Sequence, residues 1–436
     1  STKLCDYVAF FCTVLGTATT NLAADAFAHD KPGQAKRIIA SSLFVSLIIG
    51  GAVAAAMYAN AGALMRMMLG GASPGPLLTA ATDYTAIRAL GYPAALLTFV
   101  LQGGFIAAKD ARTPLLAVPI TALTNLLGDL LLVPKLGAAG AAWATTGALY
   151  ANAVTLLAFW GRKMRSLRGE NVLVARPTRL ELKQLLAFAL PMMCGLIARV
   201  YMGLSITMSA VALGTTALAA NQVIESFYWL FCPFGEAISL CMQAYLPPLL
   251  LKGRSLARRL QGSALRAAGG LGALAAVGAL VMPLCAPGLF TSSAAVAGTM
   301  AASAPALGFA LFMYVLSSAS EGMLVARKQL KVLAASHVVN TVTLSLALRA
   351  ALRTGSCGLQ HVWLLVGAAN VLRIAEFTAI LQRSDQAAVA EQKTAEPRWR
   401  LRMRKLRPRV EAARAERREN VHDAIPDVSD IASHLM

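Results

Sequence analysis

Two glutamates in the middle of the chain stand at a spacing that suits chemistry on one face of a helix. Glu225 and Glu236 are eleven residues apart, and eleven helical steps bring the second side chain to within roughly 20° of the first. Gln222 falls near the same stripe, and Pro233 would interrupt the helix between the carboxylates and free backbone carbonyls. A kinked apolar helix with two carboxylates on one face is a candidate path for a proton or a solute.

Three more polar groups lie in apolar surroundings. Asn125 and Asp129 are one helical turn apart and share a face. Asp129 is either a cleft-lining proton or cation site or a hydrogen-bonding group near the membrane interface, and both interpretations stay open. Glu321 precedes Gly322 near the end of an apolar stretch and is a candidate functional carboxylate.

Arg199 is a cation in the middle of another apolar stretch. An arginine in a cleft would suit an anionic solute, because a guanidinium binds a carboxylate with two parallel hydrogen bonds. The alternative is an internal ion pair with one of three glutamates, namely Glu225, Glu236 or Glu321.

The remaining polar residues of these stretches are interpreted as structural. Arg373 and Glu376 are three residues apart and could pair along one helix. His337 falls at a helix end with no acid nearby in the sequence. The seven cysteines are scattered without metal-binding spacing, and no Ser or Cys pairs with a His or Asp in the manner of a catalytic triad. The sequence therefore predicts no enzyme and no bound cofactor.

Composition gives these residues their setting. The 436 residues are 57% hydrophobic and only 14% charged, and the mean hydropathy is +0.60. A soluble protein carries about 25% charged residues. The net charge of +19 resides in loops and in the tail rather than on one polar face, which argues against nucleic-acid binding. We predict an all-α polytopic membrane protein.

Eleven apolar spans are predicted. They cover residues of about 6–26, 38–60, 83–108, 115–133, 138–160, 185–212, 216–247, 267–286, 299–325, 332–352 and 358–381. Lys and Arg gather in the connections after the first, third, fifth, seventh and ninth spans, whereas the intervening connections hold only Arg66, Lys135, Arg349 and Arg353. The positive-inside rule places the richer connections inside.

An internal repeat predicts how the spans are grouped. QGGFIAAKD at 102–110 resembles SEGMLVARKQ at 320–329, with Gly104 matched to Gly322. A six-helix unit repeated with the same orientation gives two lobes related by a pseudo-two-fold axis along the membrane normal. One helix is then missing before residue 1, and the intact protein is expected to have twelve. The predicted parts are an N-terminal lobe (1–160), a basic loop (161–183), a C-terminal lobe (184–382) and a basic tail (383–436).

The tail contains the basic segment RWRLRMRKLRPR at 398–409, with apolar residues on one helical face. Such a segment next to a membrane can lie on anionic lipid. The alternative is a disordered tail, which Pro397 and Pro408 favour.

These sequence patterns resemble the multidrug and toxic compound extrusion (MATE) family, most strongly at 82–150. The residues that match the plant members are Tyr84, Ile87, Arg88, Leu90, Pro93, Ala94, Gln102, Lys109, Asp110, Asn125, Asp129, Gly137, Gly140, Ala141, Ala142, Ala144 and Thr145. The chain departs from the family pattern at two positions. Ala107 stands where glycine is usual, and Asn221, within GTTALAANQV (214–223), stands where the family has a histidine. DYVAF, ATTNL and GAAWATT look closest to the plastid-envelope branch, which includes salicylate-pathway exporters.

The resemblance implies two six-helix lobes that face a central cleft and alternate between outward-open and inward-open states. It implies a monomer in the plastid envelope that exports small organic solutes in exchange for H⁺ or Na⁺. Some bacterial members carry a glutamate at the position of Arg199, so the sign is reversed here and organic anions or amphipathic aromatics are the expected solutes. A flippase for lipid-linked solutes and a membrane scaffold that transports nothing are the alternatives.

Overall fold

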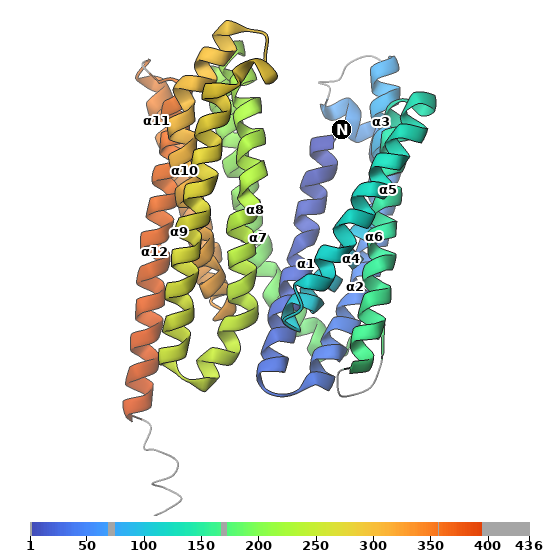
Figure 1. The fold of residues 1–436 in the computed structure, drawn as a ribbon, viewed down its shortest axis with the longest axis vertical. Helices are drawn as coiled ribbons and strands as arrows, with labels where there is room; N and C mark the ends of the chain where they lie inside the picture. Colours follow the sequence, from blue (N-terminus) through green and yellow to red (C-terminus); the bar gives the residue numbers. More distant parts are fainter. Residues whose placement is uncertain (1, 69–74, 167–171, 356, 395–436) are drawn as a thin grey trace, which may run out of the picture. The chain divides into compact units, whose positions relative to one another are not determined.

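All regular elements in the described part of the chain are helices (Figure 1). The computed structural model describes residues 2–68, 75–166, 172–355 and 357–394. The helices are α1 (Thr2–Ala28), α2 (Pro32–Met68), α3 (Pro76–Ala89), α4 (Tyr92–Ala107), α5 (Arg112–Leu136), α6 (Ala138–Ser166), α7 (Arg179–Ala212), α8 (Thr215–Lys252), α9 (Arg254–Cys285), the short 3₁₀ turn η1 (Pro287–Leu289), α10 (Ala294–Ala326), α11 (Leu330–Arg353) and α12 (Leu359–Thr394). The basic segment 398–409 lies outside the described residues.

Every predicted span falls on a helix, but one of them is less apolar than expected. Among the described residues, nine helices are long and apolar enough to cross a membrane, and the bent pair α3–α4 makes a tenth. Helix α6, which covers the predicted span 138–160, is not among them. Its sequence is rich in Ala, Gly and Thr and ends in Arg162, Lys163 and Arg165, so its hydropathy is low although it has 29 residues.

The predicted continuous span 83–108 is broken. Helices α3 and α4 meet at an angle of 43°, because Pro93 in the first turn of α4 cannot continue the hydrogen bonds of α3. The carbonyls at the break are bonded by side chains of α6. The Thr146 hydroxyl donates to the carbonyl of Ile87 (3.3 Å), and the Tyr150 hydroxyl donates to that of Leu90 (2.9 Å). A break in a membrane helix is tolerated when neighbouring side chains satisfy its backbone in this way.

Helices α1–α6 pack among themselves, and so do α7–α12 (Figure 1). We call the first set, α1–α6, the first lobe, and α7–α11 with α12 as far as Phe377 the second lobe. Residues Ser1–Phe377 form one unit, and a second unit begins at Thr378. Within the first unit, α1 contacts both α7 and α8. The exact lobe boundaries predicted from the sequence stay a prediction.

The same close helix crossing is built once in each lobe. In both crossings two glycines let backbones approach, so that an added Cβ would meet its neighbour at less than 3.0 Å. The contacts are Gly16 with Phe99 and Gly103 with Thr20 in the α1–α4 crossing, and Gly235 with Ser318 and Gly322 with Ser239 in the α8–α10 crossing. Each of the four residues in the α1–α4 crossing has a counterpart in the α8–α10 crossing, and every residue and its counterpart are separated by the same number of positions in the sequence.

This offset corrects the predicted repeat by one residue. Gly322 corresponds to Gly103, not to Gly104, whose Cβ would meet only the Ile39 side chain, at 3.2 Å. The wrong register arose because Gly103 and Gly104 are adjacent and only the backbone contact distinguishes them. At the corrected offset, Glu321 corresponds to Gln102 and Lys328 corresponds to Lys109.

Candidate functional site

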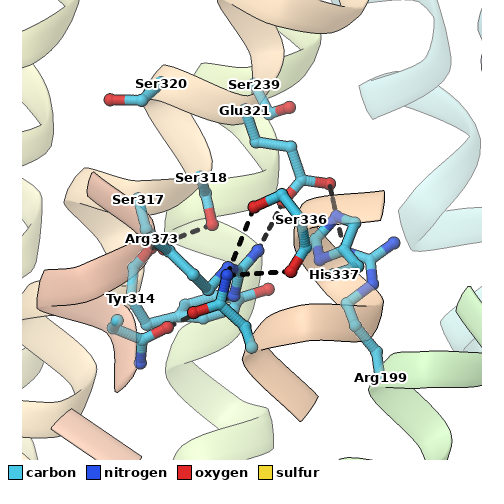
Figure 2. Close-up of polar contacts among 12 residues, drawn as sticks. Arg199, Ser239, Tyr314, Ser317, Ser318, Ser320, Glu321, Ser336, His337 and Arg373 are labelled. Atoms are coloured by element: carbon cyan, nitrogen blue, oxygen red, sulfur yellow. Dashed lines mark hydrogen bonds and ion pairs between the residues drawn. The ribbon is translucent and has the colours of Figure 1, made fainter. Parts of the chain in front are cut away.

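Four ionisable side chains from four helices meet inside the second lobe (Figure 2). Glu321 on α10 is at the centre and is buried. Arg373 Nη2 on α12 lies 2.7 Å from Glu321 Oε2. Arg199 Nη1 on α7 and His337 Nε2 on α11 each lie 3.4 Å from Glu321 Oε1. We call Arg199, Glu321, His337 and Arg373 the charged cluster.

Close helix packing brings these side chains together. Gly322 lets α10 approach α8 at the residue next to Glu321. Gly195 on α7 faces the His337 ring, where an added Cβ would lie 2.9 Å from the ring carbon Cδ2. The Thr341 hydroxyl on α11 donates to the carbonyl of Ala198 on α7, at 3.1 Å. These contacts fix α7, α10 and α11 around one point in an apolar bundle.

Within the charged cluster the arginines outnumber the carboxylate, while a second carboxylate, that of Glu236 on α8, acts on Arg199 from outside the cluster. Two guanidinium groups face one carboxylate, and His337 can add a further positive charge when protonated. The Nε atoms of Arg199 and Arg373 are buried and have no hydrogen-bond partner in the described part of the chain. Ionic groups in a lipid-embedded bundle are costly unless they are paired, so the unused Nε donors are the atoms of the cluster that a further hydrogen-bond acceptor could reach.

Arg199 is the member of the cluster that solvent can reach. Its side chain is 20% exposed, whereas that of Arg373 is 3% exposed. The Arg199 guanidinium lies 5.9 Å from the centroid of the Phe10 ring, which belongs to α1 of the first lobe. Phe10 in turn meets Trp229 of α8 edge to face, with centroids 6.1 Å apart. Arg199 therefore lies where the two lobes meet, beside two aromatic rings.

Glu376, a further carboxylate of the second lobe, has neutral hydrogen-bond donors as partners. Glu376 accepts hydrogen bonds from the Ser336 hydroxyl and from Asn340 Nδ2, the latter at 2.7 Å. The predicted pairing of Arg373 with Glu376 along one helix is therefore wrong. Arg373 turns to α10, because a buried guanidinium gains more from the equally buried Glu321.

The carboxylates predicted to share a stripe on α8 reach different partners. Glu236 is exposed and accepts a hydrogen bond from the Tyr314 hydroxyl at 2.8 Å. Glu225 accepts bonds of 3.0 Å from Thr207 Oγ1 on α7 and from Asn221 Nδ2. Gln222 is exposed. Helix α8 runs from Thr215 to Lys252 with Pro233 inside it, so it covers the whole predicted span 216–247 and continues through the proline.

Asn125 and Asp129 do share a face of α5, as predicted. Asn125 Nδ2 donates to Asp129 Oδ2 at 3.1 Å, and both side chains are half-buried. Of the seven predicted site residues, the structure joins Asn125 to Asp129 and Arg199 to Glu321. The ion pair between Arg199 and Glu321 was one of the alternatives predicted for Arg199.

Comparison with known proteins shows which family this chain resembles. The profile of the MatE family matches residues 2–131. Protein DETOXIFICATION 47, chloroplastic, of Arabidopsis thaliana is 28% identical over 392 residues, which is 84% of this chain and 67% of that protein. Protein DETOXIFICATION 43 of the same plant is 30% identical over 173 residues, 39% of this chain and 32% of that protein. The chain is similar to members of the MATE family.

Solved structures agree on the fold. A MOP superfamily transporter from Pyrococcus furiosus superposes with a TM-score of 0.76 at 18% identity, over 87% of this chain and 85% of that chain. An outward-facing multidrug resistance MATE transporter gives 0.74 at 17% identity, over 90% and 87%. The two-lobed helical fold predicted from the sequence is confirmed. Nine helices among the described residues are long and apolar enough to cross a membrane, so this chain is an integral, multi-pass membrane protein similar to MATE transporters.

Two members of the charged cluster were missed in the sequence analysis. His337 was expected to lack an acid partner, yet Glu321 is 3.4 Å away. Arg373 was interpreted as structural, yet it is the nearest cation to Glu321. One signal was available, because the apolar spans of the second lobe contain two arginines that must find acids inside the bundle. The sequence does not show which acid each arginine meets.

Proposed function

We propose that this protein is a secondary active antiporter that exports small organic anions, driven by inward movement of H⁺ or Na⁺. The observation that carries the proposal is Arg199 itself, a guanidinium with an unused Nε donor beside the junction of the two lobes. A MATE transporter for organic cations needs carboxylates at such a point. Here the carboxylate of Glu321 is shared by two guanidinium groups.

The surroundings of Arg199 suit an aromatic carboxylate. Its free Nε and one Nη form a fork that matches the two oxygens of a carboxylate. The Phe10 and Trp229 rings nearby offer faces and edges for an aromatic ring of the solute. Salicylate, with one carboxylate on one ring, is the simplest compound of this class to test.

Coupling follows from the competition for Arg199. Protonation of Glu321 would remove the negative charge that holds Arg199, and the guanidinium would then be free for the solute. Asp129, Glu225 and Glu236 are further candidates for the proton or Na⁺ path, since each accepts a hydrogen bond from a neutral donor. In this scheme proton entry and anion binding are linked by one side chain.

Two relatives support the setting of this activity. In the Pyrococcus furiosus transporter, a reverse polarity of the binding pocket suggests a different function for that protein. The Arabidopsis relative is named a chloroplastic protein, which supports a plastid membrane as the location here. We further propose a monomer whose basic tail lies on anionic lipid.

Efflux from vesicles tests the proposal. The full-length protein is reconstituted in liposomes, and export of salicylate and of a cationic dye is measured with and without a pH gradient and with and without Na⁺. We expect gradient-dependent export of salicylate and none of the dye. Arg199→Ala should lower salicylate export by about 10- to 100-fold, because a hydrogen bond to a charged group contributes roughly 1.5–3 kcal/mol, and Arg199→Lys should lower it less.

Arg349→Ala is the matched control, since Arg349 is an exposed arginine near the C-terminal end of α11 and should be dispensable. Dye export that is unaffected by Arg199→Ala would overturn the anion assignment and leave Arg199 as a structural ion-pair partner. Export of neither compound would favour the flippase or scaffold alternatives.

A further inference from the structure

Two lysines adopt the same unusual backbone conformation at equivalent places in the two lobes. Lys109 follows α4 with φ of 61°, and Lys328 follows α10 with φ of 59°. Each ends its helix with the same pair of hydrogen bonds, Lys109 N to Ile106 O and Asp110 N to Phe105 O in one lobe, Lys328 N to Val325 O and Gln329 N to Leu324 O in the other. Glycine is the residue that favours this helix end, because a Cβ is strained at positive φ.

Each lysine reaches across to the opposite lobe. Lys328 Nζ, from the second lobe, lies 2.8 Å from Asp25 Oδ2 on α1. Lys109 Nζ, from the first lobe, lies 5.6 Å from the ring centroid of Tyr245 on α8. Helices α1 and α8 are counterparts in the repeat, as their crossings with α4 and α10 show. The two contacts are therefore reciprocal.

A buried hydrogen bond joins the same two helices. Asn21 Nδ2 on α1 donates to Gln243 Oε1 on α8 at 2.6 Å, and both side chains are buried. Asn21 lies one turn from Asp25, and Gln243 lies two residues from Tyr245. These contacts join the two lobes near the C-terminal ends of α1 and α8 and at the two lysine turns. The distribution of basic loops places this end of the helices on the inner face of the membrane.

We propose that Lys109 and Lys328 are paired latches that hold the inner ends of the two lobes together and release when the transporter opens inward. A lysine at positive φ has a cost in backbone strain that glycine avoids, and what these two lysines provide instead is a side-chain contact with the opposite lobe. The proposal rests on the alternating access assigned under the proposed function. When the inner face is closed, each lobe contributes one lysine that contacts the other lobe.

The strength of the contacts suits a reversible latch. Lys328 is 49% and Asp25 is 35% exposed, and an exposed ion pair shifts an equilibrium by only about two- to fivefold. A cation above an exposed aromatic ring contributes a similar amount. Loss of one latch should therefore change the ratio of closed to open inner faces about two- to fivefold, and loss of both should multiply the two effects.

Distances between spin labels measure this ratio. The labels are placed at Gln34→Cys on α2 and Arg258→Cys on α9, both exposed near the inner ends of opposite lobes, in full-length protein whose native cysteines are replaced by alanine. Lys109→Gly and Lys328→Gly remove the side chains and suit the backbone, so thermal stability should stay equal or rise. We expect the long-distance population to increase about two- to fivefold in each variant relative to the short one.

Asp30→Gly is the matched control. Asp30 follows α1 with φ of 55° and the same helix-ending hydrogen bonds, so the substitution puts a glycine at an equivalent turn on the same face without removing a latch. If both lysine variants give the distance distribution of Asp30→Gly, the latch proposal is overturned.

A charge reversal gives a second test. Lys328→Asp should open the inner face, because aspartate tolerates positive φ but repels Asp25, and the added Asp25→Lys should close it again. No recovery in the double variant would contradict a direct latch at this pair. The distances are recorded without solute, so failure of salicylate export would overturn the anion proposal and leave the latch to be judged on its own result.

Discussion

The two lobes share a skeleton and differ in charge. Helix α4 of the first lobe and α10 of the second cross their partners through equivalent glycines, Gly103 and Gly322, and end at equivalent lysines. The residue before the glycine is Gln102 in one lobe and Glu321 in the other. Only the second lobe has two arginines and a histidine around this position in the described residues.

The difference separates what the fold requires from what transport requires. Glycines at a crossing are fixed by backbone distance, so both lobes need them. A buried carboxylate between two guanidinium groups contributes little net stability, because the cost of desolvation offsets most of the attraction. Stability alone therefore does not account for the charged cluster of the second lobe, and its position beside the Phe10 ring of the first lobe agrees with the proposed anion site.

The largest expected effect comes from breaking the charged cluster. Glu321→Gln leaves Arg373 and Arg199 without their carboxylate, and removal of one partner from a buried ion pair costs about 3–5 kcal/mol. Thermal unfolding in detergent should show a large loss of stability. Gln102→Ala, the counterpart in the first lobe, should change little, and equal losses in the two lobes would contradict the contrast between them.

The helices of both lobes could be predicted because long apolar runs and basic loops are local signals. The two inaccurate predictions about the spans each concern a single short region of the chain. The span 83–108 is broken at Gly91–Pro93, where Thr146 and Tyr150 of another helix satisfy the free carbonyls. The Ala- and Gly-rich α6 was counted as a span although its hydropathy is low.

The charged cluster was only half predictable, because its contacts join residues far apart in sequence. Arg199 and Glu321 stood out as single charges in apolar segments, and their pairing was one of three alternatives. His337 was dismissed since no acid is near it in sequence, although the packing of α7, α10 and α11 brings Glu321 to it. Arg373 was assigned to Glu376 by spacing, but burial and not spacing decides which acid a guanidinium meets.

A smaller effect should appear equally in both lobes. Gly103→Ala and Gly322→Ala would put a Cβ 2.6 Å from the backbone of Gly16 and of Ser239, respectively. Overpacking of this kind costs typically about 1–3 kcal/mol, so both variants should lose similar stability in the thermal assay. Gly104→Ala is the control, because its Cβ meets only the flexible Ile39 side chain at 3.2 Å. A loss for Gly104→Ala as large as for Gly103→Ala would restore the register first predicted from the sequence.

The smallest effect tests a difference between the two lysine turns themselves. Asp110, which follows Lys109, accepts hydrogen bonds from Lys163 Nζ (3.1 Å) and from the N–H and hydroxyl of Thr113 (3.2 and 3.0 Å). Burial alone would raise the pKa of Asp110, but these bonds outweigh it and the pKa is lowered. A carboxylate with a lowered pKa stabilises the fold above its unfolded value of about 3.9, and this stability is lost as the pH falls through the folded pKa.

Asp110→Asn should therefore lose roughly 1–2 kcal/mol near neutral pH, and the gap to the unsubstituted protein should close as the pH falls below about 4. The counterpart Gln329 carries no charge, so Gln329→Ala should give a difference that is independent of pH over the same range. If the stability difference between Asp110→Asn and the unsubstituted protein does not change with pH, the hydrogen bonds from Thr113 persist when Asp110 is protonated. The charge of Asp110 would then contribute nothing, and the turn of the first lobe would be stabilised in the same way as the uncharged turn of the second lobe.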